Sequence, residues 1–162
     1  MSKAKIICVS GMVMALYIAA MFATAGFAFG AYQVRIATAL YSLSYVLPFL
    51  VLPLAIANSI SNFAAGSFGM FDVVGGLVVG IVTAGLVYLV RRFGLPRVLI
   101  IPVIIFAPAL IVPIWLSYLL GLPYTMLVIS LAIGQTIPAV AGYFLTFAVE
   151  RILKYDSFRR NN

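Results

Sequence analysis

Long uncharged apolar stretches, separated by short polar or Gly/Pro-containing breaks, dominate the pattern along this chain of 162 residues. The first stretch, Ile6 to Ala25, carries no charge, and about 20 helical residues cross a bilayer core about 30 Å thick. Five more stretches follow, at 34–48, 50–66, 73–90, 98–120 and 124–150. None shows the alternation of a membrane β-strand. The pattern predicts one all-α domain, residues 1–162: a polytopic membrane bundle of about six helices, with the second and third stretches short enough to be partly re-entrant.

Basic residues are distributed unevenly between the two sides of this arrangement. Six crossings place nine of the ten basic residues on one side and Arg35 alone on the other. The nine are Lys3, Lys5, Arg91, Arg92, Arg97, Arg151, Lys154, Arg159 and Arg160. Because cytoplasmic loops are enriched in Lys and Arg, we expect both termini in the cytoplasm and Arg35 at the outer face. Five or seven crossings would scatter the basic clusters over both sides.

The composition fits a lipid environment and removes most enzyme chemistries. Hydrophobic residues make up 65% of the chain and charged residues 8%, a balance that a soluble domain of this size does not have. The chain has no histidine, three acidic residues and no phosphate-binding Gly-x4-Gly-Lys motif. We therefore expect no enzyme, no metal, no cofactor and no nucleic-acid partner, and we favour binding or transport. The inner loops account for the net charge of +7.

The first stretch carries small side chains at every fourth position: Gly11, Ala15, Ala19 and Ala23. In lipid, a helix face of this kind allows close approach of another helix. Two interpretations stay open, packing within the bundle and docking of a second membrane subunit. Gly76, Gly80 and Ala84 form a similar face on the fourth stretch, where we favour packing within the bundle. The first stretch also resembles a cleaved signal peptide, but its length and the following stretches favour its retention.

Small polar or charged side chains gather at the outer ends of the predicted helices. They are Gln33, Arg35, Asn58, Asn62, Asp72 and Gln135. A charge at membrane depth costs roughly 2.5–3.5 kcal/mol and usually faces a cavity or a partner. We therefore predict a substrate pocket, open to the outside, that these residues line. In the alternative, Arg35 and Asp72 form an ion pair between helices and the asparagines hold helices together. Aromatic residues at the same end, Trp115 among them, fit an interfacial belt or stacking on a planar ligand.

Two sequence elements resemble those of a known family. They are Gly30-Ala31-Tyr32-Gln33-Val34-Arg35-Ile36 and Gly69-Met70-Phe71-Asp72-Val73-Val74-Gly75-Gly76, with Asn62 between them. In residues 26–90, and in its overall layout, the chain resembles the QueT family, regarded as substrate-binding S components of energy-coupling factor transporters for queuosine precursors. The resemblance implies capture of a small molecule outside a prokaryotic cytoplasmic membrane. It also implies docking through the first helix onto a transmembrane coupling subunit, with two cytoplasmic ATPases powering release.

The ligand that the resemblance implies is a 7-deazaguanine. The Watson–Crick edge of guanine presents two adjacent N–H donors, which one carboxylate, here Asp72, can accept as a pair. Because a 7-deaza base has carbon at position seven, Arg35 would hold O6 alone or position Asp72. Many family members carry a Glu shortly after the Gln-x-Arg element, where this chain has Ala37-Thr38-Ala39. A vitamin or another nucleobase therefore stays open as the cargo, and a self-sufficient carrier is the alternative outside this class.

Overall fold

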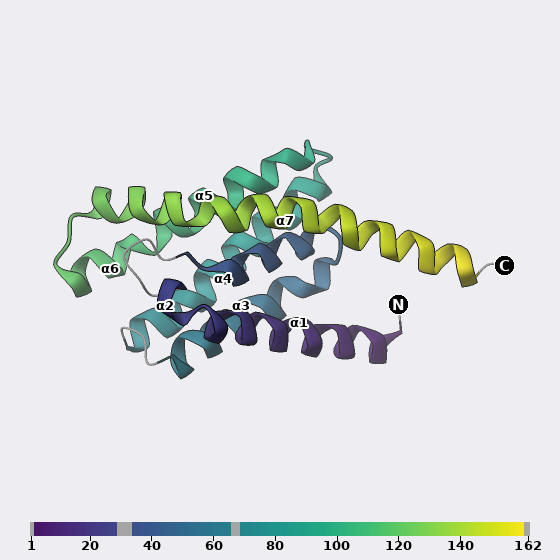
Figure 1. Ribbon diagram of the computed structural model, residues 1–162, viewed down its shortest axis with the longest axis horizontal. Coiled ribbons are helices and arrows are strands. Elements are labelled where there is room, and N and C mark those ends of the chain that lie inside the picture. The colour runs from purple at the N-terminus through teal and green to yellow at the C-terminus, as the bar shows by residue number, and fades with distance from the viewer. Residues whose placement is uncertain (1, 29–33, 66–68, 161–162) are drawn as a thin grey trace.

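The computed structural model describes residues 2–28, 34–65 and 69–160, and within these ranges it consists of helices and short connections (Figure 1). In chain order the elements are α1 (Lys3–Ala23), α2 (Ala25–Ala28), the 3-10 helices η1 (Ile36–Tyr45) and η2 (Pro48–Leu50), α3 (Val51–Ala64), α4 (Met70–Arg92), the 3-10 helix η3 (Arg97–Leu99), α5 (Ile100–Ile111), α6 (Pro113–Leu120) and α7 (Tyr124–Arg160). Each predicted apolar stretch coincides with helical structure, so the all-α prediction is confirmed.

Within the described residues, four helical segments have the length and apolar composition needed to cross a membrane. They are Lys3–Ala23, Met70–Arg92, Arg97–Leu120 and Tyr124–Leu153. The second and third predicted stretches form shorter helices, since η1 has 10 residues and α3 has 14. At about 2.0 and 1.5 Å of rise per residue, each is roughly 20 Å long, less than the hydrocarbon thickness of about 30 Å. A count of six complete crossings therefore remains a prediction.

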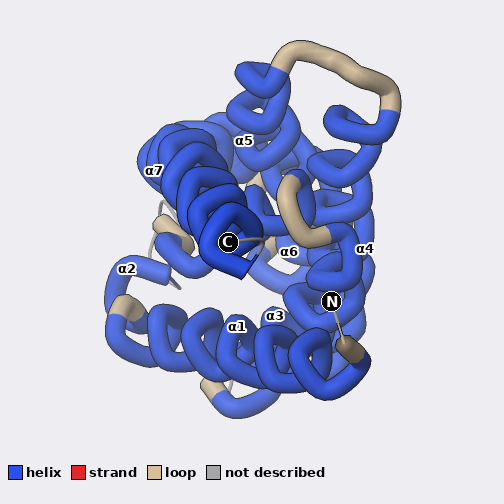
Figure 2. Tube along the Cα trace, turned by 90° about the vertical axis from the view of Figure 1, so that its right-hand side faces the viewer, coloured by secondary structure: helices blue, strands red, loops and turns tan. Residues whose placement is uncertain are grey.

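The two ends of the chain lie at the same end of the molecule, while α2 and α6 lie at the opposite end (Figure 1). Figure 2, viewed from the end with the termini, shows α1, α4, α5 and α7 arranged around the bundle. The long fifth stretch is divided at Pro113, which has no backbone N–H to continue the hydrogen bonds of α5. The following short helix α6 carries Trp115.

The 3-10 helix η1 lies in the interior and packs against α1, α4, α5 and α7. Every residue from Ala37 to Ser44 is buried, so this part of η1 has no lipid-facing or solvent-facing side, whereas Ile36 at its start is exposed. Small residues make this possible: a Cβ atom added to Gly142 of α7 would lie 2.8 Å from the carbonyl oxygen of Ala39. Runs of 3-10 helix longer than three or four residues are uncommon, so the surrounding helices hold η1 in this form.

The small-residue faces of α1 and α4 have different surroundings. On α4, a Cβ atom added to Gly80 would lie 2.5 Å from the Cα atom of Ala55 in α3, and Ala84 is fully buried. Packing within the bundle is therefore confirmed for the α4 face. On α1, the whole small-residue face defined above is exposed, and no described atom lies within 4 Å of a Cβ added to Gly11. The α1 helix instead packs inward through Tyr17 and Met21, so the internal-packing interpretation of its small-residue face is wrong.

Candidate functional site

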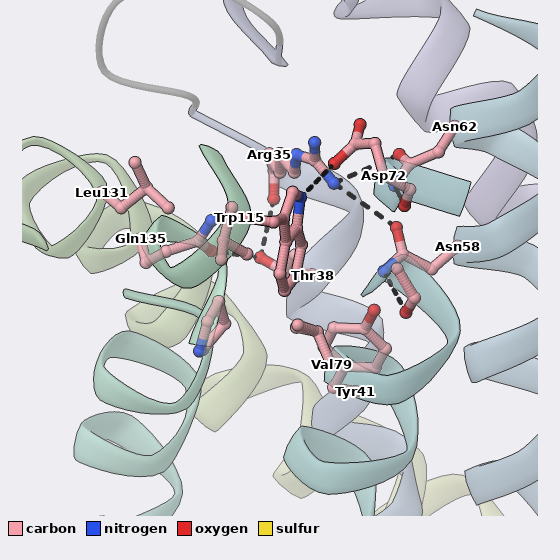
Figure 3. Close-up of a pocket in the computed structure, with 13 residues that line it drawn as sticks. Arg35, Thr38, Tyr41, Asn58, Asn62, Asp72, Val79, Trp115, Leu131 and Gln135 are labelled. Atoms are coloured by element: carbon pink, nitrogen blue, oxygen red, sulfur yellow. Dashed lines mark hydrogen bonds between the residues drawn. The ribbon is translucent and has the colours of Figure 1, made fainter. Parts of the chain in front are cut away.

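One buried cavity brings together five of the six predicted site residues (Figure 3). The five are Arg35, Asn58, Asn62, Asp72 and Gln135. They come from the start of η1, from α3, from the first turn of α4 and from α7, and all of them are buried. Gln33, the sixth, lies outside the described residues. The cavity groups the predicted residues, and their contact with substrate remains a prediction.

Arg35 directly precedes η1, and its side chain is 7% exposed. Its Nη1 atom donates to Oδ1 of Asn62 at 3.3 Å and to Oδ1 of Asn58 at 3.5 Å. Two amide oxygens thus contact one nitrogen of the buried guanidinium and offset part of its desolvation cost. The two asparagines lie one turn apart on α3, so both side chains reach the same cation.

The same two asparagines connect α3 to α4. Nδ2 of Asn58 donates to the carbonyl oxygen of Gly76 at 2.8 Å, and Nδ2 of Asn62 donates to that of Asp72 at 2.9 Å. Gly76 allows this contact, because a Cβ atom there would lie 2.6 Å from Nδ2 of Asn62. Each asparagine therefore donates its amide N–H to the backbone of α4 and accepts a hydrogen bond from Arg35 with its amide oxygen. This geometry makes them supports of the charged groups.

Asp72 lies in the first turn of α4 and is 2% exposed. Its Oδ1 atom accepts a hydrogen bond from Nε1 of Trp115 at 3.2 Å, while Oδ2 has no hydrogen-bond partner among the described residues. No ion pair joins the described side chains of Asp72 and Arg35, so the ion-pair alternative is not realised. A buried carboxylate oxygen without a donor is costly, and such groups in native proteins call for an explanation. A ligand N–H group would satisfy it.

Gln135 of α7 is the most deeply placed of the predicted residues, with 1% exposure. The partner that its depth requires is Thr38, whose Oγ1 atom lies 2.6 Å from Oε1 of Gln135. The same hydroxyl lies 2.7 Å from the carbonyl oxygen of Arg35. Since a hydroxyl has one hydrogen, it donates to one of these oxygens at a time. Thr38 thus joins α7 to the start of η1 at the cavity wall.

A profile described as QueT transporter matches residues 7–151 of the chain, a range that includes every described residue of the cavity. The chain belongs to the QueT transporter family. QueT proteins are S components of energy-coupling factor transporters, so this chain is a multi-pass transport protein of the cell membrane. The family is one of transport proteins, not of enzymes. No curated protein and no solved structure matches the chain.

Two further residues that line the cavity of this QueT protein, Thr38 and Tyr41 of η1, are not among those predicted from the sequence. Tyr41 is fully buried, and its hydroxyl lies 3.2 Å from that of Tyr17. The spacing is the signal that was available: Arg35, Thr38 and Tyr41 follow at intervals of three residues. This interval matches the period of a 3-10 helix and places all three side chains on one side of it.

The remaining wall of the QueT cavity is apolar. It consists of Val79, Pro108, Val112, Leu131 and the indole ring of Trp115. A polar side facing an apolar side suits a flat heteroaromatic ligand, which presents polar edges and apolar faces. The volume open to the centre of a water molecule is about 10 Å³, which is room for about one water. The predicted open pocket is therefore nearly filled by its own side chains in this structure.

Proposed function

We propose that this S component captures a 7-deazaguanine precursor of queuosine at the outer face of the membrane. Family membership supports the transport role. The observation that supports this ligand class is the buried Asp72 carboxylate, whose Oδ2 atom lacks a donor. One carboxylate can accept two parallel hydrogen bonds from the ring N–H and the amino group of a guanine edge. Among the described residues that line this cavity, Asp72 is the one acidic residue.

The other cavity residues have distinct roles in this proposal. Arg35 donates to the ligand carbonyl oxygen or offsets the negative charge of Asp72. Asn58 and Asn62 keep Arg35 in place by accepting hydrogen bonds from it. Gln135, supported by Thr38, offers amide atoms to another polar edge. Gln33, which precedes Arg35 by two positions, completes the proposed set.

The proposed orientation places both termini and the basic loop after α4 in the cytoplasm, with six segments traversing the membrane. The two termini lie at one end of the molecule, and α6 lies at the other (Figure 1). Arg91 and Arg92 occupy the last turn of α4, and Arg97 begins η3. The positive-inside rule assigns such residues to the cytoplasmic side, which leaves the cavity toward the outside.

We propose the exposed face of α1 as the docking surface for the transmembrane coupling subunit. Gly11, Ala15, Ala19 and Ala23 are all exposed, and small residues at four-residue spacing favour close helix packing in lipid. Two cytoplasmic ATPases attached to the coupling subunit would supply the energy for release. The chain would then need no nucleotide site of its own.

Calorimetric titration of the purified protein with 7-deazaguanine tests the proposed ligand. Guanine is the control for position seven, and 7-deazaadenine is the control for the paired N–H donors, because its edge does not present them. Submicromolar binding of 7-deazaguanine and loss of binding with 7-deazaadenine are expected. Tight binding of a vitamin instead would reassign the cargo. Ligand uptake by the isolated protein in liposomes would contradict the dependence on a coupling module.

A further inference from the structure

Trp115 lines both the described cavity and a neighbouring apolar groove. We infer that its indole ring occupies the ligand's position against Asp72, and that the substrate enters by displacing the ring into a neighbouring groove. This inference rests on the proposed function, because it assigns Trp115 the role of an internal competitor for that ligand. Three observations support it: the hydrogen bond of the indole, the volume of the cavity and the position of the groove.

The indole makes the type of contact that the ligand would make. It is a flat bicyclic ring whose Nε1–H donates to Oδ1 of Asp72 at 3.2 Å. A guanine-type ligand is also a flat bicycle, and it would offer N–H donors to the same carboxylate. The indole has a single N–H, so it leaves Oδ2 without a donor, whereas a guanine edge can satisfy both oxygens. Exchange of the indole for the ligand therefore adds a hydrogen bond at a buried site.

The volume of the cavity requires that a wall moves. About 10 Å³ is open to the centre of a water molecule, whereas ligand pockets are on the order of 300–1,000 Å³. The polar walls are fixed by hydrogen bonds from Asn58 and Asn62 to the backbone of α4. Trp115 is half-buried and lies on the short helix α6 after Pro113. Trp115 is a large side chain of the cavity wall, and a second open space adjoins its ring outside the cavity.

That space is an apolar groove on the outer surface of α4 and α6, and Trp115 lines both the groove and the cavity. The groove has about 470 Å³ open to the centre of a water molecule, enough for an indole ring. It is lined by Met70, Phe71, Val74, Gly75, Val78 and Ile114. In the membrane such a groove faces lipid, so an indole that turns into it loses the Asp72 hydrogen bond and gains apolar contacts.

Gly75 allows the indole to lie in its present position. A Cβ atom added there would lie 2.5 Å from Cζ2 of Trp115, a distance that two carbon atoms cannot keep. Gly75→Ala therefore forces the ring to leave its present position without any ligand. Gly85 lies on the same helix and has no described atom within 4 Å of an added Cβ, so Gly85→Ala is the matched control.

The first experiment uses intrinsic fluorescence, because Trp115 is the chain's one tryptophan. The full-length protein is placed in nanodiscs whose lipids carry brominated acyl chains, which quench an indole on contact. We expect greater quenching after addition of 7-deazaguanine, and greater quenching in Gly75→Ala than in Gly85→Ala without any ligand. Unchanged quenching in Gly75→Ala, in a protein that remains folded, would overturn the displacement. This second arm needs no ligand, so it tests whether the groove can take the ring even if no deazaguanine binds and the proposed function fails.

The second experiment separates a competitor from a stacking platform. In the wild type, only molecules whose indole ring has left the cavity can bind the ligand, so the apparent affinity is reduced by that fraction. Trp115→Ala makes every molecule competent, so it should bind 7-deazaguanine at least about threefold more tightly. Trp115→Phe, which keeps a ring but has no N–H donor, should associate faster than the wild type. A Trp115→Ala protein that binds more weakly than the wild type would show that the indole stacks on the ligand, and would overturn the inference.

Discussion

The side-chain amide of Asn62 donates a hydrogen bond to the backbone carbonyl of Asp72 at 2.9 Å. The amide oxygen of the same asparagine accepts from Arg35 at 3.3 Å. One neutral side chain on α3 therefore fixes the positions of the only cation and the only carboxylate that line the described cavity. This relationship makes Asn62 a positioning residue for both charges.

Replacement of Asn62 should weaken binding by loosening the positions of Arg35 and Asp72. Asn62→Ala removes the acceptor of one Arg35 N–H and the donor to the Asp72 carbonyl oxygen, and leaving such buried groups less well satisfied costs about 1–3 kcal/mol. We expect a lower melting temperature and a several-fold weaker affinity for 7-deazaguanine. Ser59→Ala is the matched control, since Ser59 also bonds from α3 to the backbone of α4, at Val73, but does not line the cavity. Equal affinity losses in both variants would contradict a special role for Asn62.

Asp72 is expected to contribute most to affinity. Asp72→Asn keeps the shape of the side chain but replaces one acceptor oxygen by a donor, so a guanine edge loses a charge-assisted hydrogen bond. Such bonds contribute roughly 1.5–3 kcal/mol, which corresponds to at least about a tenfold increase in Kd by calorimetry. Glu150→Gln, which removes a carboxylate paired with Arg97 away from the cavity, is the control for loss of charge. An unchanged Kd in Asp72→Asn would remove Asp72 from the binding site.

The contact of Gly80 with α3 predicts a stability effect unrelated to binding. In Gly80→Ala the new methyl group meets the backbone of Ala55, so α3 and α4 must separate. Overpacking of this kind typically costs about 1–3 kcal/mol. Gly85→Ala adds the same methyl group to open space and improves helix propensity. Thermal unfolding in detergent should show a lower transition temperature for Gly80→Ala alone, and equal transitions would refute the close packing.

The exposed face of α1 predicts a separation of binding from transport. Ala19→Leu places a bulky side chain on this face while leaving the cavity untouched, because α1 packs inward through other residues. We expect unchanged 7-deazaguanine affinity in the isolated protein and a several-fold decrease in uptake with the coupling module. Ala141→Leu, on an exposed position of α7, is the matched control. Normal uptake by Ala19→Leu would place the docking surface elsewhere.

The sequence predicted the helical stretches and most of the polar residues of the described cavity for one physical reason: polar groups within apolar segments are costly, so they are easily recognised. Arg35, Asp72 and Gln135 are recognisable in this way. Thr38 and Tyr41 are not, because a hydroxyl on an apolar helix is common and attracts no notice. Their three-residue spacing has meaning only once η1 is known to be a 3-10 helix, and tertiary packing determines that form.

Other features depend on contacts that a single chain's pattern does not contain. The small residues of α1 and α4 have the same spacing, yet one face is exposed and the other is packed against α3. Trp115 was expected among the aromatic residues at the outer end, but its bond to Asp72 follows from its place in α6 and from the open backbone at Gly75. The stretch Ala37-Thr38-Ala39 offers the cavity one position only, Thr38.

The supports of Arg35 and of the Asp72 backbone are amide groups, and amides neither gain nor lose protons over the physiological pH range. The chain also contains no histidine. The scaffold around the two charges therefore has no component that responds to mild acidification of the surroundings. In a cell whose medium turns acidic during growth, these amide groups would therefore keep the same hydrogen bonds to Arg35 and to the Asp72 backbone.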